Sequence, residues 1–241
     1  MATIVENLAA VRRKIERACA AAGRDPSEVR LLPVSKTHPP ELIMEAYRAG
    51  ERLFGENRPQ ELAAKAEQLR DVDDLKFAAI GHLQTNKAKL ITDWASEFHA
   101  LDSIKVAEVL DRRLQQAGRS LDVFLQVNSS GEDQKFGLPP EEVAGFAAAL
   151  ADYSSLRVRG LMTLAIFSDD QVRVGACFAL MRDLQARLRD DDAAVGSYDE
   201  LSMGMSGDFE LAIAYGATTV RVGQSIFGTR LNPDDYWNPA G

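Results

Sequence analysis

Short apolar runs alternate with amphipathic stretches along almost the whole chain, and this alternation constrains the fold more than any other feature. The apolar runs cover residues 31–36, 52–57, 76–81, 97–102, 122–128, 157–164, 200–206 and 218–223. Runs of this length separated by helical patterns are typical of parallel strands joined by crossover helices. Prolines at 39–40 and 139–140 stand where two of these helices would begin, because proline suits the first turn of a helix.

Eight such units in 241 residues predict a single-domain α/β fold, a (β/α)8 TIM barrel over about residues 31–230. An extra helix is predicted before the barrel, at about residues 3–22. Its apolar face would consist of Ile4, Leu8, Val11, Ile15, Ala18, Cys19 and Ala22. The alternative, an open doubly wound sheet, is disfavoured because the 17 glycines form no G-x-G pair and the chain has no P-loop pattern. No linker or repeat divides residues 1–241, so we expect one domain.

Charge and composition exclude several functional classes. A net charge of −8 argues against a nucleic-acid or anionic-membrane partner, because phosphate backbones and acidic lipids select basic surfaces. The cysteines Cys19 and Cys177 are far apart, and the histidines His38, His82 and His99 are scattered, so no metal site is predicted. Charged residues interrupt every apolar run of the first 23 residues, and no run is long enough to span a membrane. We therefore expect a cytoplasmic protein.

One lysine is distinguished by its position. Of the eight lysines, Lys36 alone stands at the end of a predicted strand, in "LLPVSK". The carboxyl ends of the strands form the functional face of a parallel barrel. A lysine held there out of water can have a lowered pKa and attack an aldehyde to form a Schiff base. A strand-end lysine that merely extends to solvent is an equal alternative on this pattern alone.

Two turns near the carboxyl end of the chain suggest an anion site. Ser206 and Gly207 follow the seventh predicted strand and open a helix, and Gly223 and Gln224 follow the eighth. Barrels of this class commonly bind phosphate with these two loops, through free backbone N–H groups. An ordinary helix-capping turn is the alternative for Ser206 and Gly207.

Arg221 lies inside the eighth predicted strand, where a charged side chain is costly unless it is paired or contacts a ligand. A structural salt bridge is one interpretation, and a donor to a ligand is the other. Together with Lys36 and the two anion turns, Arg221 describes a pocket for pyridoxal 5′-phosphate. An arginine at the pyridine nitrogen would make the cofactor a weaker electron sink than a carboxylate would.

Five stretches then show a family resemblance: "VSKTHP", "FGENRPQE", "IGHLQTNK", "LSMGMSGDFELAI" and "VRVGQSIFG". With these motifs the chain closely resembles the pyridoxal-phosphate homeostasis family, whose barrel is similar to the N-terminal domain of alanine racemase. The resemblance implies a Schiff base on Lys36, phosphate on Ser206 and Gly223, and a pyridine contact from Arg221. It also implies that Asn57 and His82 lie beside the cofactor.

The resemblance also bears on catalysis. Many family members have a second lysine where this chain has His38, so a role of that lysine does not carry over. Alanine racemase uses two bases, and the second comes from a C-terminal β domain. Here only "RLNPDDYWNPAG" follows the last turn, and Tyr47, Tyr153 and Tyr215 fall on helical patterns.

We therefore expect a protein that stores pyridoxal phosphate or delivers it to apo-enzymes, and we assign no catalytic residue. We also expect a monomer. One alternative is an amino-acid racemase or decarboxylase that uses Lys36. Another is a Schiff-base aldolase for a sugar phosphate.

Overall fold

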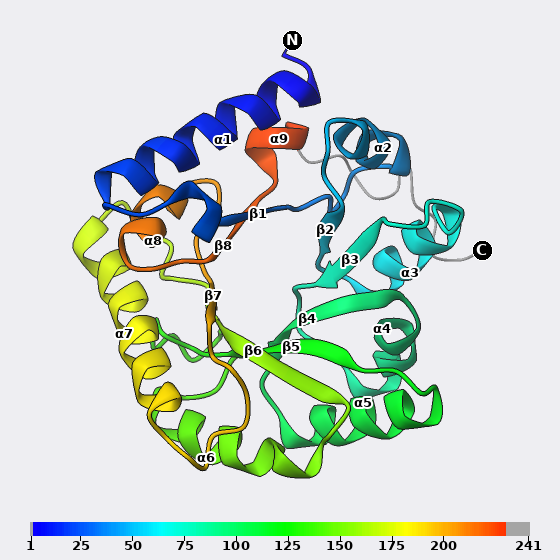
Figure 1. Ribbon diagram of the computed structural model, residues 1–241, viewed down its shortest axis with the longest axis vertical. Coiled ribbons are helices and arrows are strands. Elements are labelled where there is room, and N and C mark those ends of the chain that lie inside the picture. Colours follow the sequence, from blue (N-terminus) through cyan, green and yellow to red (C-terminus); the bar gives the residue numbers. More distant parts are fainter. Residues whose placement is uncertain (1, 230–241) are drawn as a thin grey trace.

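The computed structural model describes residues 2–229 and contains a barrel of parallel strands surrounded by helices (Figure 1). The strands are β1 (Arg30–Pro33), β2 (Leu53–Glu56), β3 (Lys76–Ala79), β4 (Ala95–Leu101), β5 (Leu121–Gln126), β6 (Leu156–Met162), β7 (Glu200–Ser202) and β8 (Thr219–Val222). The helices are α1 (Ile4–Ala21), α2 (Pro40–Arg48), α3 (Pro59–Gln68), α4 (Ala88–Trp94), α5 (Ile104–Gln116), α6 (Val143–Ala149), α7 (Gln171–Arg189), α8 (Phe209–Ala214) and α9 (Gln224–Phe227). The predicted fold class is confirmed.

All eight predicted strands are present, and each ends earlier than its apolar run does. The first run, predicted to end at Lys36, leaves the ladder at Pro33, and only an isolated bridge from Val34 continues it. The seventh, predicted over 200–206, ends at Ser202, and Gly204 then adopts a φ of +94° that glycine alone adopts readily. The apolar residues beyond each ladder belong to the loops that form the mouth of the barrel.

Helix α1 confirms the predicted N-terminal helix and packs outside the strands against α8 and α9 (Figure 1). Thr3 caps it, with its side chain accepting from the Glu6 N–H at 3.2 Å. The buried face carries Ile4, Leu8, Val11, Ile15 and Cys19, as predicted, whereas Ala18 and Ala22 are partly exposed.

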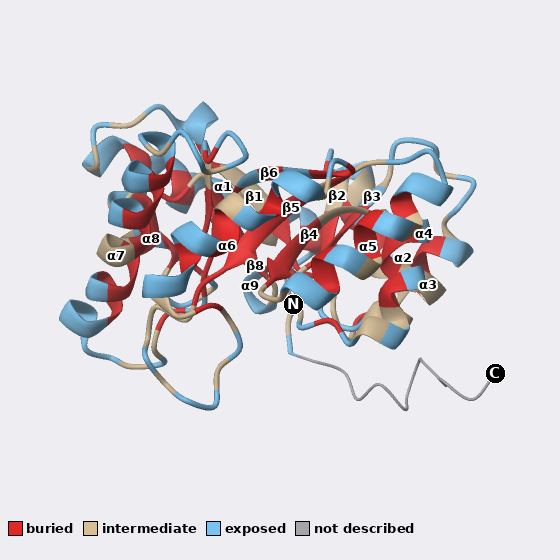
Figure 2. Cartoon of the chain, turned by 90° about the horizontal axis from the view of Figure 1, so that it is seen from below, coloured by how far each residue is buried: buried red, intermediate tan, exposed pale blue. Residues whose placement is uncertain are grey.

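The inner parts of the molecule are the strands and the helix faces turned toward them, while the outer helix faces are exposed (Figure 2). Cys19 and Cys177 are buried free thiols in α1 and α7. Among residues 2–229, no helix combines the length and apolar character needed to cross a membrane. The predicted barrel limit at residue 230 and the segment "RLNPDDYWNPAG" lie outside the described residues.

The barrel closes between β1 and β2, the first and last strands of the sheet order β1-β8-β7-β6-β5-β4-β3-β2. Backbone closure there is slight: Val34 bridges Gly55, and the Ser35 N–H donates to the Gly55 carbonyl at 3.0 Å. We call this contact the closing seam. Side chains must therefore contribute to holding it.

A buried ion cluster on the outer side of the closing seam supplies these side-chain contacts. Lys65 of α3 donates to Glu56 Oε1 at 2.7 Å, to Glu61 Oε1 at 2.8 Å and to the Ser35 carbonyl at 2.8 Å. Ser35 Oγ also donates to Glu56 Oε1, at 2.6 Å. Lys65 and both carboxylates are almost completely buried. The cluster joins the ends of β1 and β2 to α3.

Removing the lysine should open this cluster. The change Lys65→Met would leave two carboxyl groups buried without their cation, so we expect unfolding free energy to fall by about 3–5 kcal/mol. Lys89→Met is the control, because Lys89 is exposed in α4 and should change stability by less than about 0.5 kcal/mol. Urea denaturation followed by circular dichroism measures both. Equal effects of the two substitutions would contradict a structural role for Lys65.

The cluster should also make stability depend on pH. Burial raises the pKa of Glu56 to about 7, above its ordinary value of 4.5, although Lys65 opposes the shift. Between these two values the folded protein holds a proton that the unfolded chain releases, so stability should fall as pH rises through this window.

The difference between wild type and Glu56→Gln isolates this contribution. From pH 5 to pH 8, wild type should lose up to about 3 kcal/mol more unfolding free energy than the variant does. Urea denaturation at the two pH values measures the loss. Parallel pH profiles would show that Glu56 stays ionised in the fold throughout this range.

Candidate functional site

A pocket of about 630 Å³ opens at the carboxyl ends of the strands, a volume within the range typical for small-molecule and cofactor sites. Every residue predicted for the site lines it: Lys36, Asn57, His82, Ser206, Gly207, Arg221, Gly223 and Gln224. These residues come from the loops after β1, β2, β3 and β7 and from β8 and the turn after it. The fold therefore brings together side chains that are distant in sequence.

Lys36 lies in the turn after β1, and its two neighbours are both held by the ion cluster. The cluster binds Ser35 through its hydroxyl and carbonyl, and the Thr37 N–H donates to Glu61 Oε1 at 2.6 Å. Thr37 has a φ of +62°, which costs a non-glycine residue about 1–2 kcal/mol. The hydrogen bond that the strained Thr37 donates to Glu61 fixes the turn, and Lys36 lines the pocket from a rigid base.

Ser206 and Gly207 lie in the turn between β7 and α8, and Gly223 and Gln224 begin α9. In the described part of the chain, the backbone N–H groups of these four residues donate to no protein acceptor. A Cβ added to Gly223 would lie 3.0 Å from the Val34 carbonyl, so this position has room for little beyond glycine. Free N–H donors on a narrow glycine turn, with the Ser206 hydroxyl, fit a phosphate group.

The turn at Ser206 is braced by a partly buried carboxyl. The Met205 N–H donates to Asp208 Oδ1 at 2.6 Å, and burial raises the pKa of Asp208. Helix α8 has only six residues, so the free N–H groups themselves must supply most of the anion binding.

Arg221 is in β8, as predicted, and its side chain is almost fully buried. It donates to Ser202 Oγ at 2.8 Å and to the Thr163 carbonyl at 2.7 Å. No carboxylate within residues 2–229 forms a salt bridge with it, so the described residues give no support to the structural salt bridge considered above. Burial lowers its pKa to about 10, which leaves it protonated at neutral pH. Its remaining N–H groups are available to a ligand in the pocket.

Asn57 and His82 border the pocket from the loops after β2 and β3. These loops touch closely, since a Cβ added to Gly81 would lie 2.2 Å from the Asn57 carbonyl oxygen. The His82 ring stacks on Phe136, with ring centroids 3.8 Å apart. Both residues are thus in the predicted neighbourhood, and His82 joins the β3 loop to the loop after β5.

His38 also lines the pocket, although its role was left open. It is buried, its ring stacks on Phe227 at 5.4 Å, and its Nδ1 atom has no hydrogen-bond partner among the described residues. Burial and the charge of Lys65 lower its pKa, so the ring is neutral at pH 7. At the position where many family members have a second lysine, this chain therefore has a neutral imidazole with one nitrogen that has no partner among the described residues.

Sequence reasoning missed two groups of residues. Glu61 and Lys65, which hold the Lys36 turn, were signalled only by their four-residue spacing on a helix. The apolar rim of the pocket comprises Phe136, Leu164, Phe167 and Met205, and Phe167 is fully exposed. No tyrosine lines the pocket in residues 2–229, and no cluster of three metal-ligating side chains occurs there.

Comparisons with known proteins agree with this geometry. The family model for the alanine racemase N-terminal domain matches residues 7–231. A pyridoxal phosphate homeostasis protein of Pseudomonas aeruginosa is 42% identical over 240 residues, covering 100% of both chains. The protein of the same name from Escherichia coli is 39% identical over 232 residues, covering 95% of this chain and 98% of its own.

Solved structures extend the comparison. PipY of Synechococcus elongatus, a structure with PLP bound, is 38% identical with a TM-score of 0.83, covering 94% of this chain and 100% of PipY. Alanine racemase of Streptomyces lavendulae is 17% identical with a TM-score of 0.69. That alignment covers 94% of this chain and 59% of the racemase, and it shows a shared barrel fold alone. On the full-length similarity to its curated relatives, the chain belongs to the pyridoxal phosphate homeostasis protein family.

Proposed function

We propose that this protein binds pyridoxal 5′-phosphate reversibly through Lys36 and keeps it for other proteins, without robust catalysis of its own. The observation that carries the proposal is convergence: an amine, two turns with free N–H groups and a buried arginine all face one pocket of about 630 Å³. Each of these groups matches a different part of the cofactor. PipY, at 38% identity, was solved with the same cofactor bound.

Each residue would bind the part of the cofactor that matches its chemistry. When bound, pyridoxal phosphate supplies an aldehyde for amines and a ring that withdraws electrons. Lys36 Nζ would bond the aldehyde carbon, and the turns at Ser206, Gly207, Gly223 and Gln224 would hold the phosphate. Arg221 would donate to the ring nitrogen without giving up its proton, because guanidinium stays protonated. Asn57 and His82 would border the ring.

Storage or delivery is favoured over catalysis because no tyrosine among residues 2–229 lines the pocket as a second base. Racemisation with two bases needs a second proton-transfer group opposite the lysine. Within residues 2–229 no tyrosine lines the pocket, and His38 is enclosed against Phe227. An amino-acid racemase or decarboxylase that uses Lys36 is the second candidate.

The proposal also covers the partners, the oligomeric state and the location of the protein. Acceptors would be apo-enzymes that need the cofactor, and the protein would act as a monomer. The enclosure of the strands by helices supports the monomer (Figure 2). A cytoplasmic location is supported by Cys19 and Cys177, which are buried in separate helices as free thiols.

Borohydride labelling tests the covalent site. Protein mixed with pyridoxal phosphate should absorb in the visible, and reduction should fix the cofactor on the peptide that contains Lys36. Lys36→Ala should lose the absorbance and the label, because the remaining contacts are non-covalent. Lys135→Ala is the matched control and should keep both. Labelling of another lysine in wild type, or equal labelling of Lys36→Ala, would refute the assignment.

Deuterium exchange divides the carrier from the enzyme. The loaded protein, incubated in D₂O with a panel of L-amino acids, should exchange less than one α-proton per protein over an hour. Transfer to an apo-enzyme, followed by recovered activity of that enzyme, should be faster than release of free cofactor. Repeated exchange turnovers would support the racemase or decarboxylase reading.

A further inference from the structure

A continuous chain of hydrogen bonds runs through the interior of the barrel, where bulky aliphatic side chains usually pack. It begins at Arg30, at the start of β1, and ends at Arg221 in the pocket. We call it the interior chain, and its members are Arg30, Glu97, His99, Ser202 and Arg221. His99 is buried at the centre of the interior chain.

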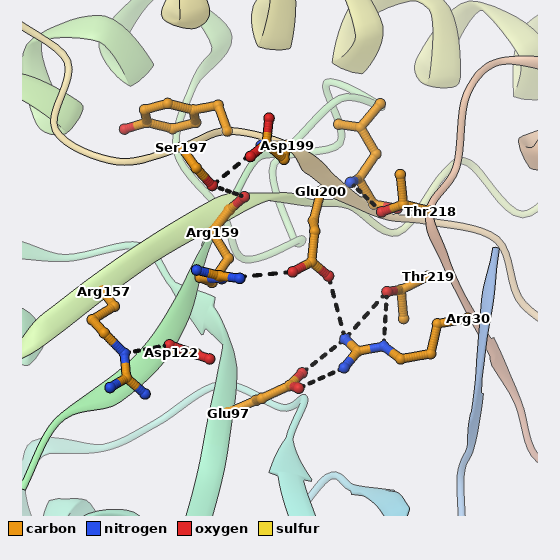
Figure 3. A network of polar contacts seen from close by, with 12 residues as sticks. Arg30, Glu97, Asp122, Arg157, Arg159, Ser197, Asp199, Glu200, Thr218 and Thr219 are labelled. Atoms are coloured by element: carbon orange, nitrogen blue, oxygen red, sulfur yellow. Dashed lines mark hydrogen bonds and ion pairs between the residues drawn. The ribbon is translucent and has the colours of Figure 1, made fainter. Parts of the chain in front are cut away.

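The lower end of the interior chain lies at the amino ends of the strands (Figure 3). Arg30 binds Glu97 with two hydrogen bonds, of 2.6 and 2.9 Å, and lies 3.5 Å from Glu200 Oε2. Both Arg30 and Glu97 are partly accessible there, with 37% and 13% of their side-chain surface exposed. The charge of Glu97 is thus compensated at the face of the barrel opposite the pocket.

The upper end is almost completely buried. Glu97 Oε2 lies 2.8 Å from His99 Nε2, and His99 Nδ1 lies 2.9 Å from Ser202 Oγ. Arg221 then donates to the same Ser202 oxygen at 2.8 Å. His99 and Ser202 have no exposed surface, so these contacts have no competition from solvent.

The chemistry of the two ends determines the direction of every hydrogen bond. Arg221 has only donors, so Ser202 Oγ must accept from it. Hydrogen bonds from His99 and Arg30 hold the pKa of Glu97 near 2 despite burial, so this carboxylate accepts from His99 Nε2–H. Burial lowers the pKa of His99, so the ring is neutral and its Nδ1 carries no proton. Ser202 can then donate its only O–H to Nδ1.

A doubly protonated His99 would break this pattern. Its Nδ1–H would donate to Ser202, which already accepts from Arg221, and the Ser202 proton would have no acceptor within the interior chain. The neutral form with the proton on Nε2 satisfies every member. The direction therefore follows from satisfied hydrogen bonds as well as from burial.

We infer that Glu97, His99 and Ser202 are positioning residues, which hold the Arg221 guanidinium from the far side of the barrel so that its free N–H groups face the ligand. This inference rests on the proposed function, because it assigns Arg221 to the ring nitrogen of the cofactor. Two of the five N–H groups of Arg221 donate to Ser202 and Thr163. Both acceptors are neutral, so neither supplies a negative charge that would compete with the ligand. The interior chain thereby makes the site selective for an aromatic aldehyde phosphate with an unprotonated ring nitrogen.

The first test uses the ligand-free protein. Nitrogen-15 NMR of the three histidines at pH 7, with His99→Phe to assign the signal, should show His99 protonated on Nε2 and bare at Nδ1. A proton on Nδ1 would overturn the inferred direction. This result does not depend on cofactor binding.

The second test measures selectivity. Dissociation constants are compared for pyridoxal phosphate and for its analogue with a carbon in place of the ring nitrogen. Wild type should bind pyridoxal phosphate about tenfold more tightly than the analogue, as expected for a hydrogen bond from a charged donor. Ser202→Ala and His99→Phe should reduce this ratio to within about threefold.

Phe124→Leu is the matched control. Phe124 is buried with its ring centroid 4.0 Å from that of His99, and it makes no hydrogen bond in the interior chain. It should destabilise the barrel but keep the tenfold ratio. An unchanged ratio in Ser202→Ala and His99→Phe, or the same decrease in Phe124→Leu, would overturn the positioning role. If wild type binds neither ligand, the proposed function fails, and the His99 tautomer still decides the direction of the interior chain.

Discussion

The buried contact between Lys65 and the two carboxylates Glu56 and Glu61 is the interaction on which the site depends. The barrel closes between β1 and β2 with little backbone pairing, and this cluster joins both strand ends to α3. Burying such charges costs several kcal/mol per ion, which close hydrogen-bonded partners offset. The offset is incomplete here, because Glu56 Oε2 has no hydrogen-bond partner among the described residues. This desolvation cost is spent at the functional site, because the same cluster holds both neighbours of Lys36.

The two key groups of the pocket are held from behind in different ways. Lys36 is fixed from outside the barrel, by an ion cluster in the layer between strands and helices. Arg221 is fixed from inside the barrel, by a chain of hydrogen bonds that reaches the opposite face. Both arrangements hold the backbone and flanks of these residues rigidly, while their side chains line the pocket. Preorganisation of this kind is what selective binding of a small cofactor requires.

The fold and most of the site were predictable for a physical reason. Alternating apolar runs and helical periodicity are local properties, so the strands and the N-terminal helix were correctly expected. Strand ends were placed too late, as at Lys36 and at residues 203–206, because apolar loop residues look like strand residues in a sequence. The salt bridge considered for Arg221 is not found among residues 2–229, where two neutral acceptors bind the buried guanidinium instead.

The sequence by itself determined the barrel, its family and the residues that meet in the pocket, since periodicity and short motifs carry this information. Only the tertiary structure decided how those residues are held. Ser202 and His99 are 103 positions apart, and Lys65 meets Ser35 across 30, so no local pattern links them. Their contacts arise because strand alternation and barrel closure set distant side chains at hydrogen-bond distance, where burial makes each partner obligatory.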